Sequence, residues 1–196
     1  GGERDEIQFC FQGGEPTLAG LPWFRRFSQK AQELRRPGQR VSYAIQTNAM
    51  DLDEDWCRYF REHRYLVGVS LDGFQENHDF FRRTPEGEGT FPRVMAALEL
   101  LKAHRVEVNI LTVLTSRLGE KPQRLFRFYR EQGFDHVQLI PCLPSLEGAP
   151  EMDRWALTPE GFVHFYRGFF DCWYEELQRG RHLSVTLLDN LIPLIL

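Results

Sequence analysis

The segment Glu6-Ile-Gln-Phe-Cys-Phe-Gln-Gly-Gly-Glu-Pro-Thr-Leu18 decides the fold of this 196-residue chain. It opens as a β-rich run, Ile7 to Phe11, and passes through a Gly-Gly turn toward a helical pattern that extends from Leu21 to Arg36. Apolar side chains in that pattern recur every three or four residues, which predicts a helix with one buried face. A strand that leads through a short turn into a helix is the repeating element of parallel α/β folds.

The same alternation of strand-like and helix-like segments continues along most of the chain. The predicted strands are 7–11, 41–46, 66–71, 106–114, 136–140 and 183–186, and the predicted helices are 21–36, 53–63, 91–104, 121–132 and 159–179. Strand 66–71 is apolar at nearly every position, as expected where both faces of a sheet are covered. We therefore expect a barrel or an open parallel α/β sheet, in which ligands bind at the carboxyl ends of the strands.

Composition limits the kinds of partner that the chain can have. A net charge of −4 with 27% charged residues provides no basic field for nucleic acid. No apolar run approaches the roughly 20 residues needed to cross a bilayer. The four cysteines are dispersed without the close spacing of a metal site or the density of a disulfide framework. These features favour one soluble, cytoplasmic domain with no metal ligands in this chain.

The turn after the first strand is the first candidate for binding chemistry. Gly13 and Gly14 would let the backbone approach a ligand closely, because no Cβ stands in the way. Glu15 would add a carboxylate where a cationic amine could be held. The alternative is an ordinary Gly-Pro turn between a strand and a helix, and the two glycines alone do not decide between these interpretations.

The run Phe11-Gln-Gly-Gly-Glu-Pro-Thr-Leu-Ala-Gly-Leu21 resembles the GGEP segment of radical S-adenosylmethionine (SAM) enzymes. Its leading Gln and trailing Thr-Leu are similar to the anaerobic sulfatase-maturating branch of that superfamily. Further stretches agree in order, so that the resemblance covers nearly the whole chain. They are Gln46-Thr-Asn48, Gly68-Val-Ser-Leu-Asp-Gly73, His78 through Arg82-Arg83, Val106-Glu-Val-Asn-Ile-Leu111, Gln138-Leu-Ile-Pro-Cys-Leu143 and Phe170-Asp-Cys-Trp-Tyr174.

The resemblance implies which residues contact the cofactor, S-adenosylmethionine. Its ammonium would meet Gly14 and Glu15, with Gly13 beside them, and its carboxylate would meet Arg82. Its ribose hydroxyls would meet Ser70, and its adenine would meet Leu143. Taken singly, each is better explained by an ordinary structural role: Ser70 as a strand-end turn residue, Arg82 as one of a solvated basic pair, and Leu143 as core. Together they are expected to converge on one pocket.

Other polar side chains at strand ends are candidates for binding the substrate. They are Gln12, Gln46, Asn48 and Asp72. Asn48 and Asp72 could instead make turn hydrogen bonds to nearby backbone, which is common for these residue types. No residue of this chain is singled out as a catalytic acid, base or nucleophile.

The fold and activity implied by the resemblance are those of a partial parallel (β/α)6-type radical SAM barrel. The intact enzyme would oxidise a cysteine or serine of a sulfatase to Cα-formylglycine, using S-adenosylmethionine and a [4Fe–4S] cluster. Its implied partners are the sulfatase polypeptide and a reductant protein such as a flavodoxin or ferredoxin, with neither nucleic acid nor membrane.

Two parts of the family pattern are not found between Gly1 and Leu196. These are the CxxxCxxC loop that holds the cluster and the C-terminal cysteine-rich SPASM domain. The chain also begins with Gly and ends on the apolar run Leu191-Ile-Pro-Leu-Ile-Leu196. We therefore expect residues 1–196 to be a radical SAM core truncated at both ends and inactive alone.

Two other functions stay open at the level of sequence. The chain could belong to a radical SAM/SPASM enzyme that modifies another peptide, because the GGEP segment is shared broadly. It could also be a non-catalytic α/β binding module in which Gly13 and Gly14 form only a turn.

Overall fold

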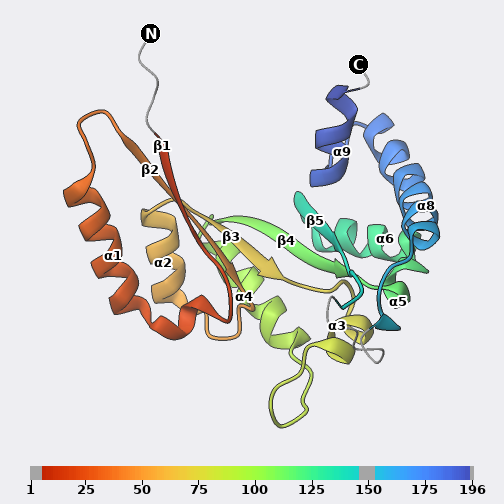
Figure 1. Cartoon of the computed structure of the whole chain (residues 1–196), viewed down its shortest axis with the longest axis horizontal. Coiled ribbons are helices and arrows are strands. Elements are labelled where there is room, and N and C mark those ends of the chain that lie inside the picture. The colour runs from red at the N-terminus through yellow and green to blue at the C-terminus, as the bar shows by residue number, and fades with distance from the viewer. Residues whose placement is uncertain (1–5, 146–152, 195–196) are drawn as a thin grey trace. The chain divides into compact units, whose positions relative to one another are not determined.

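The computed structural model describes residues 6–145 and 153–194 (Figure 1). Six strands alternate with helices, and the strand order follows the chain, β1-β2-β3-β4-β5-β6. Residue contacts divide the described chain into two units, 6–70 with 92–109 (unit 1) and 71–91 with 110–145 and 153–194 (unit 2). Neighbouring strands within each unit pair in parallel, which confirms the predicted α/β class.

Unit 1 is built on three parallel strands, in which Phe11 pairs with Ile45 and Ile45 with Val67. The helices that complete it are two α-helices between the strands, a short 3-10 helix after the first strand, and nearly all of a later α-helix. In chain order the elements are β1 (Glu6–Phe11), η1 (Pro16–Ala19), α1 (Leu21–Leu34), β2 (Arg40–Thr47), α2 (Glu54–Glu62), β3 (Tyr65–Ser70) and α4 (Phe91–Ala103).

Aromatic side chains fill the space between the strands and helices of unit 1. Phe11 of β1 meets Phe24 of α1 edge-on with ring centroids 5.0 Å apart, and Phe24 meets Trp56 of α2 at 5.2 Å. Helices α1 and α2 accordingly lie side by side against the strands (Figure 1). The buried hydroxyl of Tyr59 donates to the Phe24 carbonyl at 2.9 Å. This hydrogen bond offsets the free-energy cost of burying the hydroxyl in the aromatic core.

Unit 2 contains the last five residues of β4 and the elements that follow, together with a short helix that precedes β4. Val113 pairs with Ile140 and Val137 with Val185 in its parallel strands. In chain order the elements are α3 (Gln75–Phe81), β4 (Glu107–Leu114), α5 (Ser116–Gly119), α6 (Pro122–Gln132), β5 (His136–Pro141), α8 (Pro159–Gln178), β6 (Ser184–Val185), α9 (Thr186–Leu191) and η2 (Ile192–Leu194).

Helices α6 and α8 pack against each other in unit 2 (Figure 1). Phe126 of α6 meets Phe169 of α8 edge-on at 5.3 Å, and Tyr129 and Phe165 are fully buried beside them. The start of α8 and the end of α6 are formed by residue types that are common at helix termini. Thr158 accepts a hydrogen bond from the backbone of Gly161 at the start of α8, and Gly133 ends α6 in the left-handed conformation.

All eleven predicted strands and helices are present within a few residues of their expected bounds. Among the elements that the structure describes, three short α-helices were not predicted, α3, α5 and α9. Because α9 begins at Thr186, the predicted strand 183–186 is reduced to Ser184–Val185. Within the described residues, no helix combines the length and hydrophobicity required to span a membrane.

Gly73 follows the Ser-Leu-Asp stretch and offers a test of the packing in unit 2. Its φ is +71°, and a Cβ there would lie 2.8 Å from Cδ1 of Leu125, whose side chain is fully buried. Gly73→Ala therefore combines backbone strain with overlap and should lower the free energy of unfolding by about 2–4 kcal/mol. Chemical denaturation measures the change.

Gly133→Ala is the matched control for Gly73→Ala. Gly133 has a similar φ of +67°, but a Cβ there meets no atom within 4 Å. It should cost only the backbone term, about 1 kcal/mol. Equal losses of stability in the two variants would contradict the assigned overlap with Leu125.

Candidate functional site

The turn that follows β1 has open space beside its two glycines. Gly13 and Gly14 have φ values of +92° and +56°, and a Cβ at either position would meet no atom within 4 Å. Both residues are exposed. The glycines are therefore required by the backbone conformation rather than by packing, and the space in front of them is open to a ligand.

Glu15 holds this turn in place through both of its carboxylate oxygens. Oε1 accepts from the backbone N–H and the hydroxyl of Thr17, at 3.1 and 2.7 Å, and from the hydroxyl of Thr47 at 2.8 Å. Oε2 accepts from the backbone N–H of Asn48 at 2.7 Å. The carboxylate thereby caps η1 and ties the turn after β1 to the carboxyl end of β2.

The other predicted residues of unit 1 lie at strand ends, as expected. Gln12 and Gln46 are exposed and, within the described residues, make no side-chain hydrogen bond; the half-buried Ser70 is the last residue of β3. Asn48 accepts from the backbone N–H of Met50 at 2.9 Å. That bond confirms the turn interpretation of Asn48 and leaves its amide nitrogen available.

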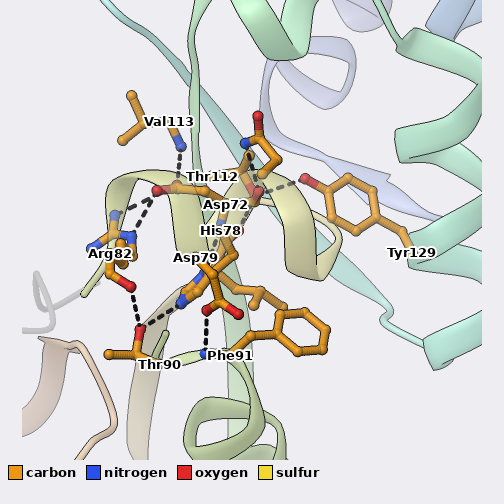
Figure 2. A network of polar contacts seen from close by, with 11 residues as sticks. Asp72, His78, Asp79, Arg82, Thr90, Phe91, Thr112, Val113 and Tyr129 are labelled. Atoms are coloured by element: carbon orange, nitrogen blue, oxygen red, sulfur yellow. Dashed lines mark hydrogen bonds and ion pairs between the residues drawn. The ribbon is translucent and has the colours of Figure 1, made fainter. Parts of the chain in front are cut away.

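In unit 2, Asp72 and Arg82 form an ion pair (Figure 2). Arg82 Nε donates to Asp72 Oδ2 at 2.7 Å, and Nη2 lies 3.5 Å from Oδ1. The backbone N–H of Val113, in β4, donates to Oδ1 at 2.9 Å. The Asp72 side chain is 6% exposed and that of Arg82 is 30% exposed, so the acid is enclosed and the base reaches the surface.

His78 links the backbones of Asp72 and Arg82 (Figure 2). Its Nδ1 accepts from the backbone N–H of Asp72 at 3.1 Å, so its Nε2 carries the proton and donates to the Thr90 hydroxyl at 2.9 Å. That hydroxyl in turn donates to the Arg82 carbonyl at 3.0 Å. Burial lowers the pKa of His78 to about 4, against the opposing influence of Asp72 and Asp79, so the imidazole is neutral at neutral pH.

Further hydrogen bonds secure the segment between the acid and the base. Asn77 donates to the Asp72 carbonyl at 2.9 Å, and the Arg82 N–H donates to the His78 carbonyl at 2.8 Å. Asp79 accepts from the backbone N–H of Phe91 at 2.8 Å. Helix α3 is therefore held by polar contacts along its whole length.

Leu143 lies beyond the end of β5 with 76% of its surface exposed. The backbone of the preceding Cys142 is fixed on both sides, because its N–H donates to Leu114 at 3.0 Å and its carbonyl accepts from Leu157 at 2.8 Å. The exposed leucine therefore has an anchored backbone. The stretch 143–157, rich in Pro and Gly, is expected from its sequence to form a long loop, and its residues 146–152 lie outside the described residues.

The structure thus brings Glu15 together with Asn48 in unit 1, and Asp72 together with Arg82 in unit 2. It adds Thr47, His78, Thr90 and Val113, which were not predicted as site residues. Thr47 and His78 do lie inside two of the matching stretches, so their position in the sequence was a usable signal. Thr90 and Val113 act through a hydroxyl and a backbone N–H, for which the sequence carries no signal.

Comparison with known proteins gives the class of the chain. The family model described as the Radical SAM superfamily matches residues 3–131, and the chain belongs to that superfamily. Within it, the chain is similar to the cysteine-type anaerobic sulfatase-maturating enzyme of Clostridium novyi (strain NT), with 35% identity over 188 residues, 96% of this chain and 50% of that protein.

A serine-type enzyme is a more distant relative. The serine-type anaerobic sulfatase-maturating enzyme of Klebsiella aerogenes is 30% identical over 93% of this chain and 44% of its own length. Among solved structures, native anSMEcpe with bound AdoMet and Kp18Cys peptide superposes with a TM-score of 0.90 at 34% identity, covering 97% of this chain and 53% of that chain. The chain spans about half the length of the relatives it matches.

The contacts of Glu15 lead to a prediction about stability. In Glu15→Gln the amide nitrogen must face either the Asn48 N–H or the donors of Thr17 and Thr47, which leaves donors unpaired. The free energy of unfolding should fall by about 1–3 kcal/mol. Glu33→Gln, which removes an exposed ion pair with Lys30 and keeps an amide oxygen that can accept from Gln29, should change it by less than about 0.5 kcal/mol. Equal effects in chemical denaturation would contradict the role given to Glu15.

The pKa of His78 leads to a prediction about pH. Because it is lowered from 6.5 to about 4, the unfolded chain binds the proton more readily between these values. The contribution of neutral His78 to the free energy of unfolding should be fully present above pH 6.5. It should fall by roughly 1 kcal/mol per pH unit as the pH drops toward 4. His78→Gln removes the titrating group, so its denaturation profile should be flatter across that window. Parallel profiles for the two proteins would refute the assignment.

Proposed function

We propose that this chain forms the S-adenosylmethionine-binding part of an anaerobic sulfatase-maturating enzyme. The whole enzyme would oxidise a cysteine or serine of a sulfatase to Cα-formylglycine. The observation that carries the proposal is the open Gly13-Gly14 turn, held by Glu15, in a chain that is 35% identical to a cysteine-type sulfatase-maturating enzyme across 96% of its length.

The residues of each unit suit the chemical groups of S-adenosylmethionine. In unit 1, the turn leaves space that a Cβ at Gly13 or Gly14 would occupy, and its backbone together with Glu15 would hold the ammonium. Ser70 would contact the ribose hydroxyls. In unit 2, Arg82 carries a permanent positive charge for the carboxylate, and the exposed Leu143 offers an apolar surface to adenine.

S-adenosylmethionine, when bound and reduced by one electron, supplies the hydrogen-abstracting chemistry of the superfamily. The contribution of this chain to that chemistry is to bind and orient the molecule. Gln12, Gln46 and the free amide of Asn48 are the candidate contacts for the substrate peptide.

The residues of this chain do not fit a [4Fe–4S] cluster. Within the described part of the chain, no three or more His, Cys, Asp or Glu side chains gather in a way that could hold a metal ion. The sequence of residues 1–196 contains no CxxxCxxC triplet. The roles proposed for this chain are therefore confined to S-adenosylmethionine and the peptide.

The proposed assignment of residues 1–196 is a partial radical SAM core domain of a larger cytoplasmic enzyme. Its partners would be a sulfatase polypeptide and a reductant protein such as a flavodoxin or ferredoxin. The solved structure of native anSMEcpe with bound AdoMet and Kp18Cys peptide supports a peptide as the class of substrate.

The substrate is tested with the full-length protein under anaerobic, reducing conditions. A peptide from a sulfatase carrying the target Cys or Ser should gain an aldehyde that a hydrazide probe traps, whereas the same peptide with Ala should not. Cleavage of S-adenosylmethionine without aldehyde would reject sulfatase maturation and favour another peptide modification. Absence of both reactions in a cluster-loaded protein would favour a binding module.

The cofactor contact is tested by Gly14→Asn in the full-length protein. Asparagine tolerates a positive φ, so the turn should survive while the new side chain fills the open space. Binding of S-adenosylmethionine should weaken by about 10-fold or more, as calorimetry measures, because the contact is lost or blocked.

Gly38→Asn is the matched control for the Gly14 variant. Gly38 lies in the turn before β2 with a φ of +82°, and like Gly14 it has no atom within 4 Å of a Cβ. Its substitution should leave the affinity for S-adenosylmethionine as it is. An equal loss in both variants would show a general effect of the substitution and would count against binding at Gly14.

A further inference from the structure

We infer that Asp72 is a positioning residue that orients Arg82 toward the carboxylate of S-adenosylmethionine. Asp72 binds one edge of the Arg82 guanidinium, so that the other edge faces the ligand. This inference rests on the proposed function and deepens it. Asp72 was grouped at the level of sequence with the side chains that could bind substrate. Its carboxylate is instead engaged by the protein itself.

The first support is that both oxygens of Asp72 are already occupied. Oδ2 accepts from Arg82 Nε at 2.7 Å, and Oδ1 accepts from the backbone N–H of Val113 at 2.9 Å. The carbonyl of Asp72 accepts from Asn77, and its N–H donates to His78. Every polar group of Asp72 is therefore fixed, and its 6% exposure leaves little surface for a ligand.

The second support is the edge of Arg82 that remains. A guanidinium has five N–H donors in a rigid plane and can bind one carboxylate along each of two edges. Asp72 takes the edge formed by Nε and Nη2. Among the residues that the structure describes, Nη1 has no acceptor, and 30% of the side chain is exposed. The outer edge thus keeps the fork geometry that a second carboxylate fits.

The third support is that the backbone of Arg82 is anchored independently. Its N–H donates to the His78 carbonyl at 2.8 Å, and its carbonyl accepts from the Thr90 hydroxyl at 3.0 Å. With the backbone held at one end and Nε at the other, the long side chain loses most of its rotamer freedom before a ligand arrives. Binding then costs less side-chain entropy than it would for a free arginine.

The test exploits the fact that an amide cannot replace this carboxylate. In Asp72→Asn, the amide nitrogen must face either the Val113 N–H or the Arg82 Nε–H, and one of these donors loses its partner. Arg82 should remain charged but be less well oriented. The expected loss is confined to ligands that carry the carboxylate.

Two probes separate positioning from a general structural role. Calorimetry on the full-length protein compares S-adenosylmethionine with decarboxylated S-adenosylmethionine, which lacks only the carboxylate. Asp72→Asn should weaken binding of the first by about 10-fold and change binding of the second by less than about twofold. Arg82→Ala should show the same selectivity with a larger loss for S-adenosylmethionine, about 30-fold.

Asp79→Asn is the matched control, because Asp79 is another acid of the same segment and lies in α3 between Asp72 and Arg82. Asp79 accepts from the backbone N–H of Phe91 with one oxygen, so an amide can keep that bond while its nitrogen points away. Both affinities should stay at their wild-type values. If Asp72→Asn does not fold, Arg82→Lys makes the test, because a compact ammonium keeps the charge but cannot bridge two carboxylates. It should also lose affinity for S-adenosylmethionine selectively.

The outcomes distinguish the inference from the proposed function. Selective loss in Asp72→Asn or Arg82→Lys, with Asp79→Asn unchanged, supports the positioning role. Equal losses for both probes, or none, in Asp72→Asn overturn it, as does wild-type binding by Arg82→Lys. If Arg82→Ala is selective while Asp72→Asn is not, only the inference falls. If Arg82→Ala shows no selectivity, the cofactor role of Arg82 falls as well.

Discussion

Each unit contains a carboxylate that follows a strand and accepts hydrogen bonds from other parts of the same unit. The conformation of the turn after that strand depends on these bonds. Glu15, after β1, accepts from the hydroxyl of Thr47 and the N–H of Asn48 at the end of β2. Asp72, two residues after β3, accepts from Arg82 and from the N–H of Val113 in β4. A partly buried carboxylate is costly unless each oxygen is paired, so these contacts restrict the turns to one conformation.

That restriction matters because Gly13 and Gly14 lie in a turn and Arg82 follows the end of a helix, outside regular structure. Loops are ordinarily the most mobile parts of a domain. A binding site built on them has a lower affinity, because the loops lose conformational entropy when the ligand orders them. In this protein the Gly13-Gly14 turn and the Arg82 side chain are each held by an acid whose hydrogen bonds within the protein form before a ligand binds. The two acids therefore act as a fixed support for groups that remain available.

The sequence predicted the parallel α/β fold well, because alternating strand and helix patterns depend on local periodicity. Helix α3 was missed for a physical reason: it is only seven residues long, and the buried side chains on it are the polar Asn77 and His78 rather than apolar residues. The family resemblance pointed to Arg82 and Asp72 separately. It could not show that they pair, since that contact depends on how the chain turns between them and on the N–H of Val113.

The Gly13-Gly14 turn also bears on how variants of this protein are to be interpreted. No atom lies within 4 Å of a Cβ at either glycine, so a small side chain there disturbs the fold mainly through backbone strain. Under the proposed cofactor contact, a mutational scan scored by growth that requires the enzyme would rank these positions among the most sensitive, whereas a scan scored by thermostability or expression would show only the moderate cost of backbone strain. The gap between the two rankings is a signature by which ligand-facing glycines are told apart from those that merely shape a loop.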